Sequence, residues 1–356
     1  MEVAIMKNNQ LPSVSHSDWH GKPYFSLDAW CKNTYGEKLY KTAIDLGLTC
    51  PNRDGSLGKG GCIFCSAGGS GDFAIPIRQS KEGSDGFSAS GNALLDDARF
   101  RDAYQKSREL FSCKKTGKRF IIYFQAYTNT YGPIVYLERM YRLALEEPTA
   151  AGISIATRPD CLPKTVMELL ARLKKEYPSK FIWVELGLQT IREQTASFLR
   201  RGYSLSCFED ALQKLQKAGI PVITHIILRL PGESEEDMLS AMDYLNGQPV
   251  WGVKLQLLHT LKGTDLALLW QKDPALYGSF SSLEAYLDVL TASLERLRPD
   301  MVVHRLTGDA PRNLLISPLW SADKRRVLNT LHKRMREQNT WQGKFYRQEA
   351  EALQAD

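Results

Sequence analysis

Short apolar runs recur along this chain and alternate with segments that have helical spacing. The runs are of the type that is buried on both faces of a parallel sheet, and we interpret them as strands. They cover residues 43–48, 119–125, 151–156, 181–186, 221–228 and 252–258. The helical segments cover residues 93 to about 113, 133–147, 163–177, 191–200 with 207–218, and 233–245.

This alternation of strand and helix predicts the fold class. Parallel strands need crossover connections, which are usually helices and are almost always right-handed. A full eight-fold barrel typically uses about 250 residues, and six units fit the patterned region better. We therefore predict an α/β fold: a partial (β/α)6 TIM-like barrel at residues 39–275, with an N-terminal extension at 1–38 and a C-terminal α/β extension at 276–356.

Three cysteines follow the first predicted strand, in a Gly-rich loop at residues 50–65. Cys62 and Cys65 form a C-x-x-C, and Cys50 begins the loop. Thiolates at the C-x-x-C spacing can bind adjacent irons of one cluster. Ferredoxins supply four cysteines, so a set of three predicts an iron with an open position at which an exogenous ligand could bind.

Zinc and a disulfide are the alternatives for these cysteines. A Cys3His zinc site would need a nearby histidine, and only His16 and His20 are close in the sequence. A disulfide is disfavoured because the seven cysteines are an odd number and no secretory signal precedes them. The four other cysteines show no paired spacing, and we interpret them as buried or incidental thiols.

Polar residues also gather where the second to fifth predicted strands end. In parallel α/β folds, ligands bind at the carboxyl ends of the strands, so these residues should lie beside the cysteine loop. The segments are 125–131 (QAYTNTY), 157–160 (TRPD), 185–190 (ELGLQT) and 229–233 (RLPGE).

Taken together, these motifs resemble the radical S-adenosylmethionine (SAM) family, and within it a bacterial group related to the catalytic subunit of Elongator. The resemblance covers about residues 39–328. It implies a 4Fe-4S cluster on Cys50, Cys62 and Cys65, with SAM bound to the open iron. One electron from the reduced cluster would cleave SAM to methionine and a 5′-deoxyadenosyl radical, which abstracts hydrogen from a substrate. Eleven residues separate Cys50 from Cys62, and such long first spacings mark the Elongator-like branch.

The resemblance also implies contacts to SAM. It places Arg201 against the SAM carboxylate, Asp160 against the ribose hydroxyls and His225 near the adenine. The family's usual Gly-Gly-Glu motif for the SAM amine is missing after the second strand, where oxygens of residues 125–130 could accept from the ammonium instead. The remaining expected SAM contacts are Gln125, Tyr127, Asn129, Thr157, Glu185 and Gln189.

Each of these residues also has a structural alternative. Asp160 could be a turn or N-cap residue ahead of the next helix, and Gln189 could cap the helix that follows it. Arg201 could pair with Glu193 on its own surface.

Composition and charge add limits on partners. The apolar fraction of 43% and the charged fraction of 24% are ordinary for globular proteins. No apolar run is long enough to span a membrane and residues 1–17 are polar, so we expect a cytoplasmic protein without a membrane partner. A net charge of +6 permits a polyanionic partner.

The C-terminal region predicts one more strand and a helix. Residues 301–312 indicate a strand and a Gly-Asp loop, where His304, Arg305, Asp309 and Arg312 could meet substrate or form a turn. Residues 322–337 indicate a basic amphipathic helix. Its cations could hold RNA phosphates, or they could form a solvated face above an apolar stripe.

Two hypotheses follow from the sequence. The first is a radical SAM enzyme with an unknown substrate, for which a tRNA nucleoside is suggested by kinship alone. It would need a flavodoxin- or ferredoxin-type electron donor. The second is a non-catalytic RNA-binding or regulatory protein stabilised by zinc or an iron–sulfur cluster. No acetyltransferase-sized domain follows the barrel, so we do not expect the acetyl-CoA chemistry of the Elongator subunit.

Overall fold

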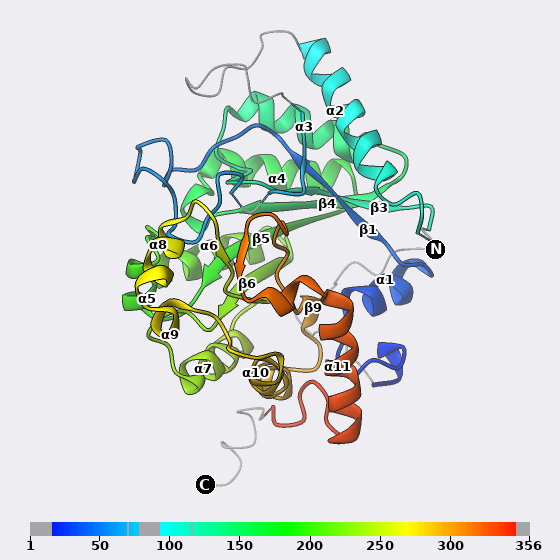
Figure 1. Ribbon diagram of the computed structural model, residues 1–356. Coiled ribbons are helices and arrows are strands. Elements are labelled where there is room, and N and C mark those ends of the chain that lie inside the picture. The colour runs from blue at the N-terminus through cyan, green and yellow to red at the C-terminus, as the bar shows by residue number, and fades with distance from the viewer. Residues whose placement is uncertain (1–15, 70, 78–92, 115–116, 347–356) are drawn as a thin grey trace, which may run out of the picture.

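One parallel sheet organises the chain, and the computed structural model describes it through residues 16–69, 71–77, 93–114 and 117–346. The sheet has eight strands in the order β2-β1-β3-β4-β5-β6-β7-β9 (Figure 1). The bounds are β1 Tyr40–Asp45, β2 Ile75–Pro76, β3 Phe120–Phe124, β4 Ala150–Thr157, β5 Phe181–Gln189, β6 Val222–Leu228, β7 Gly252–Leu257 and β9 Val302–Arg305. A separate antiparallel pair joins β8 (Thr260–Leu261) to β10 (Leu315–Ser317).

Helices connect the parallel strands and cover the outer face of the sheet. They are α2 Ala93–Glu109, α3 Ile134–Glu146, α4 Lys164–Glu176, α5 Glu193–Phe198, α6 Leu205–Lys217, α7 Glu235–Asn246 and α10 Leu283–Arg296. The other helical elements are η1 His16–Trp19, α1 Leu27–Tyr35, η2 Pro159–Cys161, α8 Asp265–Lys272, α9 Pro274–Tyr277, η3 Leu319–Ala322 and α11 Lys324–Glu337. In the described residues, no helix combines the length and apolarity that crossing a membrane requires.

The partial barrel predicted from the apolar runs is confirmed. The six predicted strands are β1 and β3 to β7, and they lie side by side in sequence order. Two further strands extend the edges: the short β2 pairs with β1, and β9 pairs with β7. Since β9 lies in the predicted C-terminal extension, the sheet continues past residue 275.

The first strand lies three residues earlier than predicted. It pairs with β3 from Tyr40 to Ile44, and the chain turns at Gly47, whose φ of 71° is one that other residues rarely adopt. The Asp45 carboxylate accepts a hydrogen bond from the Gly47 N–H at 2.8 Å. The predicted strand extended to residue 48 because Leu46 and Leu48 are apolar. They lie beyond the end of β1 and are buried in the core.

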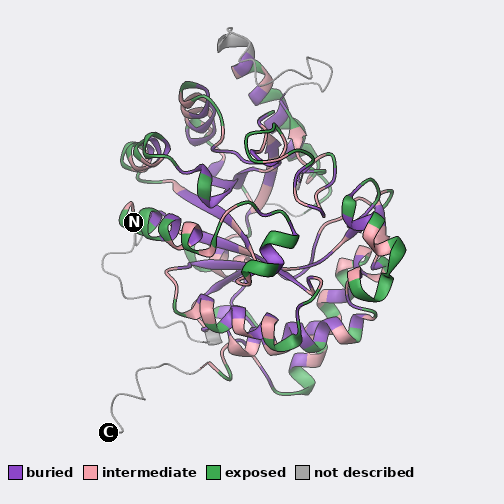
Figure 2. Cartoon of the chain, turned by 90° about the vertical axis from the view of Figure 1, so that its left-hand side faces the viewer, coloured by how far each residue is buried: buried purple, intermediate pink, exposed green. Residues whose placement is uncertain are grey.

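Aromatic side chains fill the amino-terminal end of the barrel. Phe181 and Trp183 of β5 stack with ring centroids 3.8 Å apart, and Trp30 of α1 contacts Trp183 and Trp251 edge-on at 5.1 and 5.2 Å. Such edge-to-face packing is favourable for large rings and excludes water. In Figure 2 the buried strands run through the centre and the exposed surfaces lie on the outer helices. The closed end leaves the carboxyl ends of the strands as the place for a ligand.

Candidate active site

The cysteine loop leaves the carboxyl end of β1 and borders the main cavity of the described residues. Cys50, Cys62 and Cys65 all line this cavity, whose volume is about 560 Å³. Residues that follow β3, β4 and β5 form the walls beside them. The three cysteines and the strand ends therefore meet in one space, as the sequence predicted.

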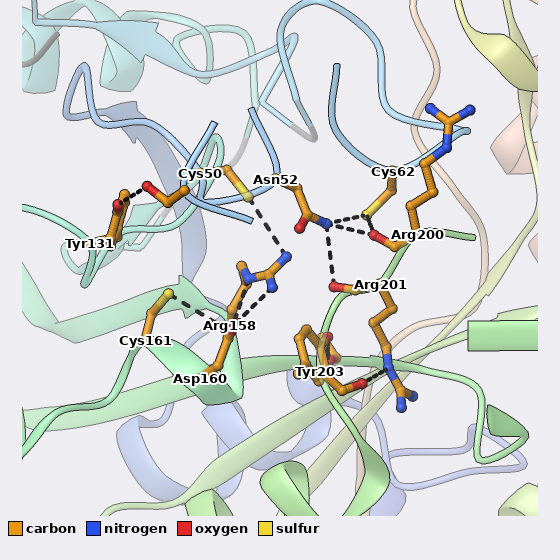
Figure 3. A network of polar contacts seen from close by, with 12 residues as sticks. Cys50, Asn52, Cys62, Tyr131, Arg158, Asp160, Cys161, Arg200, Arg201 and Tyr203 are labelled. Carbon is orange, nitrogen blue, oxygen red and sulfur yellow. Dashed lines mark hydrogen bonds and ion pairs between the residues drawn. The ribbon is translucent and has the colours of Figure 1, made fainter. Parts of the chain in front are cut away.

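Asn52 fixes the loop to the opposite wall of the cavity. Its side-chain N–H group donates to the carbonyl oxygen of Arg200 at 2.6 Å and points toward the Cys62 sulfur at 3.6 Å (Figure 3). Its backbone carbonyl accepts from the Gly61 N–H at 2.8 Å. Gly61 has a φ of 84°, so a residue without Cβ lets the chain turn there ahead of Cys62. These contacts tie the cysteine loop to the segment of Arg200.

The C-x-x-C thiols influence each other. The hydrogen bond from Cys65 lowers the pKa of the Cys62 thiol to about 7 although burial opposes the shift, while the same contact and burial raise the pKa of Cys65. The Cys65 N–H also bonds to the Cys62 carbonyl oxygen at 3.0 Å. A thiolate is the form that binds metals, so the lowered pKa of Cys62 favours ligation by that residue.

The residues present fit an iron–sulfur cluster better than a single ion. Among the described residues, no three His, Cys, Asp or Glu side chains converge as ligands of one metal ion. Thiolates of a 4Fe-4S cluster bind different irons and so surround a common space, as these three do. His20 contacts Asn33 of α1 at 2.7 Å, at the amino-terminal end of the barrel. The zinc alternative therefore gains no ligand from His20, and the side chain of His16 lies outside the described residues.

The structure brings seven of the nine expected SAM contacts to the cavity wall. They are Gln125, Tyr127, Thr157, Glu185, Gln189, Arg201 and His225. Asn129 is buried behind the wall, where its amide donates to the carbonyl oxygens of Ala126 and Ala156 at 3.0 Å each. It ties the end of β3 to β4. Thr128, which belongs to the segment 125–130 considered for the SAM ammonium, also lines the cavity.

Asp160 contacts an arginine, and it is absent from the cavity wall. Its two carboxylate oxygens accept from Arg158 at 2.9 and 2.7 Å. This pair places the Arg158 guanidinium over the Tyr203 ring at 4.9 Å, with one nitrogen 3.9 Å from the Cys50 sulfur. Figure 3 shows Arg158 between Asp160 and Cys50. Asp160 thus orients a cation toward the Cys50 sulfur, a role that the sequence motif did not reveal.

Arg201 is already paired within the protein. Its guanidinium donates to the carbonyl oxygens of Leu188, Thr190 and Tyr203 at 2.8 to 3.0 Å and to the Glu193 carboxylate at 3.3 Å. This is the local pairing weighed in the sequence analysis, extended by three backbone contacts. In this arrangement Arg201 holds the connection between β5 and α6, and its hydrogen-bonding groups are engaged there.

A layer of polar side chains crosses the barrel between the cavity and the aromatic end. Glu185 is at its centre and accepts from Lys41 at 2.5 Å, from Ser154 at 2.6 Å and from Lys254, while His225 Nε2 lies 2.8 Å away. The Lys254 ammonium also donates to the hydroxyl of Tyr123 at 3.1 Å. The members of this polar layer are Lys41, Tyr123, Ser154, Glu185, His225 and Lys254, each from a different strand.

The charges of the polar layer follow from burial and pairing. Burial raises the pKa of Glu185, but attraction to Lys254 and Lys41 outweighs it and holds the pKa well below its usual range. Burial and the nearby Lys254 lower the pKa of His225 to about 4. At neutral pH the layer therefore holds one carboxylate, a neutral imidazole and two lysines, whose own pKa values are lowered by burial.

Sequence reasoning missed the two lysines of this layer. Lys254 stands in an apolar strand, but the polar residues Lys254 and Gln256 alternate with Val253, Leu255 and Leu257. Alternate residues of a strand face opposite sides of the sheet. That alternation was the available signal for an inward-facing polar row on β7.

A partial parallel barrel with a three-cysteine loop at the carboxyl ends of its strands is the arrangement that a known superfamily shares. The model described as the radical SAM superfamily matches residues 50–245, and the radical SAM C-terminal domain matches residues 250–337. The chain belongs to the radical SAM superfamily, a class of enzymes. Membership implies SAM and a 4Fe-4S cluster as cofactors.

Relatives narrow the position within the superfamily. The uncharacterized protein YtqA of Bacillus subtilis is 39% identical over 343 residues, which is 96% of this chain and 97% of that protein. YhcC of Escherichia coli K12 is 31% identical over 292 residues, or 82% of this chain and 85% of its own length. Both relatives match along most of their length, so the shared architecture extends beyond the barrel.

The expected kinship with the Elongator catalytic subunit is confirmed. Elongator complex protein 3 of Schizosaccharomyces pombe is 27% identical over 186 residues, covering 51% of this chain and 32% of that longer protein. The solved structure of the archaeal Methanocaldococcus infernus Elp3 has a TM-score of 0.56 at 16% identity, covering 72% of this chain and 62% of the other. The likeness to the archaeal structure is one of fold alone.

Proposed function

We propose that this chain holds a 4Fe-4S cluster on Cys50, Cys62 and Cys65, cleaves SAM reductively at the fourth iron and abstracts hydrogen from a nucleoside of tRNA. The arrangement of the three thiols supports the proposed cluster. All three line one cavity, and no fourth cysteine of the described residues joins them on its wall. A coordination set one ligand short is suited to an exogenous ligand.

The cluster supplies the electron and SAM supplies the 5′-deoxyadenosyl group that becomes the hydrogen-abstracting radical. The protein holds and shields these groups. Arg158 donates toward the Cys50 sulfur and so stabilises negative charge on a cluster ligand. On another side of the cavity, Phe64, Ile227 and Leu258 form an apolar wall, which limits the access of water to a reactive intermediate.

Polar groups on the strand ends are available for SAM. Gln125, Thr128 and Thr157 offer amide and hydroxyl oxygens to an ammonium or a ribose, and they lie on the same wall of strand ends. Below them, Glu185 and His225 of the polar layer also face the cavity. Because His225 is neutral at pH 7 and its Nε2–H donates to the Glu185 carboxylate, its Nδ1 can accept one hydrogen bond from an adenine without adding charge.

The tRNA part rests on kinship with Elongator complex protein 3 and on the net charge of +6, which favours a polyanionic substrate. A flavodoxin- or ferredoxin-type protein is the proposed electron donor. The tRNA substrate and the electron donor are separate molecules that bind to the protein, so they are tested separately from the cluster.

The cluster is tested by anaerobic purification with iron analysis, followed by incubation with SAM and a chemical reductant. We expect about four irons per chain and formation of 5′-deoxyadenosine, as a 4Fe-4S site requires. Cys62→Ala should lose both. Cys161→Ala is the matched control, because Cys161 is a buried thiol outside the cavity wall and should retain both.

The substrate is tested by comparing modified nucleosides of total tRNA from cells with and without the gene. We expect one modified nucleoside to disappear and a precursor to accumulate. An unchanged profile removes the tRNA proposal and leaves the radical SAM assignment intact.

A further inference from the structure

The lining of the cavity includes residues beside β1 and beside the edge strand β9, which do not pair with each other. On the β1 side, its wall continues over the end of α2 through Leu110, Phe111 and Lys114. On the β9 side, it is lined by Arg305 and Asp309. Near the aromatic end of the barrel, Lys41 Nζ lies 3.5 Å from His304 Nδ1, across the space between β1 and β9. We call the opening above this contact the β1–β9 gap.

Cations and aromatic rings are interleaved on the β1 side of the gap. The Lys114 ammonium lies 5.0 Å from the centroid of the Phe111 ring and 5.5 Å from that of Tyr40. The Lys38 ammonium lies 4.8 Å from the same Tyr40 ring. Lys38 and Lys114 are exposed, and within the described part of the chain neither forms an ion pair with a carboxylate.

Two more cations lie on the β9 side. Arg305 pairs with Asp309 at 3.1 Å, and Lys324, the first residue of α11, contacts the same carboxylate. Partial burial, with repulsion from Arg305 and Lys114, lowers the pKa of Lys324 to about 8. A second nearby carboxylate, Glu37, is already paired with Arg119 at 3.7 Å.

We infer that this cationic rim, made of Lys38, Tyr40, Phe111, Lys114, Arg305 and Lys324, is the docking surface for the backbone of an RNA substrate. Lysine and arginine neutralise phosphates, and aromatic rings beside them can stack on bases, a combination typical of single-stranded nucleic acid sites. Tyr40 and Phe111 are half-buried, with ring centroids 5.1 Å apart. One nucleotide would then reach the cavity through the β1–β9 gap. The inference rests on the proposed function and adds the place and chemistry of substrate binding.

The outer part of α11 contrasts with the rim. Lys333 pairs with Glu337 at 3.7 Å, and Arg334 contacts the Asp288 carboxylate. Val327, Leu331 and Met335 are buried against the core. This part of the helix is the solvated face above an apolar stripe that the sequence analysis weighed, and Lys333 and Arg334 have carboxylate partners there. On the rim, by contrast, Lys38 and Lys114 have no carboxylate partner among the described residues, and Arg305 and Lys324 share the carboxylate of Asp309.

Binding of bulk tRNA to the anaerobically loaded full-length enzyme tests the inference, with affinity measured by fluorescence anisotropy over a series of salt concentrations. Lys114→Ala combined with Lys324→Ala should weaken binding at least tenfold. It should also reduce the slope of log affinity against log salt by about two, since each lost phosphate contact removes roughly one. Iron content and circular dichroism check that the variant is folded and loaded.

Lys333→Ala is the matched control on the same helix, and it should change neither affinity nor slope. Equal affinity and slope for the double variant and the wild type would overturn the inference, as would failure of the wild type to bind tRNA. In either case, 5′-deoxyadenosine formation by the wild type reports on the proposed function independently. If the wild type formed no 5′-deoxyadenosine, that result would contradict the assignment as a radical SAM enzyme.

Discussion

The carboxylate of Glu185 accepts a hydrogen bond from Lys254 across the interior of the barrel, from β7 to β5. The same carboxylate accepts from Lys41 of β1, so two lysines share one counter-charge. All three lie on inward-facing strand positions, and the Glu185 side chain is fully buried. This arrangement makes Glu185 the residue on which the charge balance of the polar layer depends.

Glu185→Gln should therefore destabilise the fold strongly. The amide keeps the shape but leaves two lysines without a carboxylate, and removing one partner of a buried pair costs about 3–5 kcal/mol. Denaturant unfolding under anaerobic conditions measures the loss. Glu168→Gln is the control. Glu168 is exposed on α4 and pairs with Lys164 at 3.7 Å, and such surface pairs contribute about 0–1 kcal/mol to stability. A Glu185→Gln protein as stable as this control would refute the role of the carboxylate.

The contacts of Arg201 predict a structural role that can be separated from SAM binding. Arg201→Lys cannot reach the carbonyl oxygens of Leu188, Thr190 and Tyr203 together, so we expect a loss of stability on the order of 2 kcal/mol. Thermal unfolding of the loaded protein checks this. If stability is unchanged and the Kd for SAM rises instead, Arg201 binds the SAM carboxylate, as the family resemblance implied.

We predict that Arg158 raises the reduction potential of the cluster. A cation near the Cys50 sulfur favours the reduced, more negative cluster, so Arg158→Ala should lower the reduction potential by roughly 60 mV, a tenfold change for one electron. The Asp160 carboxylate left behind acts in the same direction. A potentiometric titration followed by electron paramagnetic resonance measures the shift. Arg200→Ala, which removes an exposed guanidinium paired with Asp265, should leave the potential unchanged, and an unchanged Arg158→Ala would contradict the assignment.

Buried histidines predict a loss of stability in acid. Burial is the main cause that lowers the pKa of His225 and of His259 to about 4, from an ordinary value of 6.5. The unfolded state then takes up protons before the folded state does, so stability present above pH 6.5 is lost as the pH falls toward 4. Between pH 7 and pH 5, each histidine should account for about 2 kcal/mol.

His259→Gln tests this pH dependence. The variant should lose less stability than the wild type over the same pH interval, in denaturant titrations at pH 7 and pH 5. Equal losses in the two proteins would show that His259 is protonated as readily in the folded state as in the unfolded one.

The sequence could predict the elements that local pattern determines. Apolar runs located six strands, and the spacing of Cys50, Cys62 and Cys65 located the cluster loop, because both signals lie within short segments. The limits of β1 were missed because burial of Leu46 and Leu48 looks the same in a strand and in a loop.

Contacts between strands could not be predicted in the same way. Lys41 and Lys254 are 213 positions apart and meet only because register places both beside Glu185. Asp160 lies in the expected motif, yet its role depends on which group the Arg158 guanidinium faces, and that requires the loop of Cys50 in place. A partner within a short segment, such as Glu193 for Arg201, was therefore predictable, but partners on distant strands were not.

The vacant iron is the central claim, and electron paramagnetic resonance of the reduced, fully loaded protein tests it most directly. Spectra are recorded without SAM and with SAM that carries isotopic labels in its amino and carboxylate groups. We predict that SAM changes the cluster signal and that the labels give hyperfine couplings to it. A protein with four irons per chain whose signal SAM leaves unchanged, with no coupling to the labels, would contradict the account.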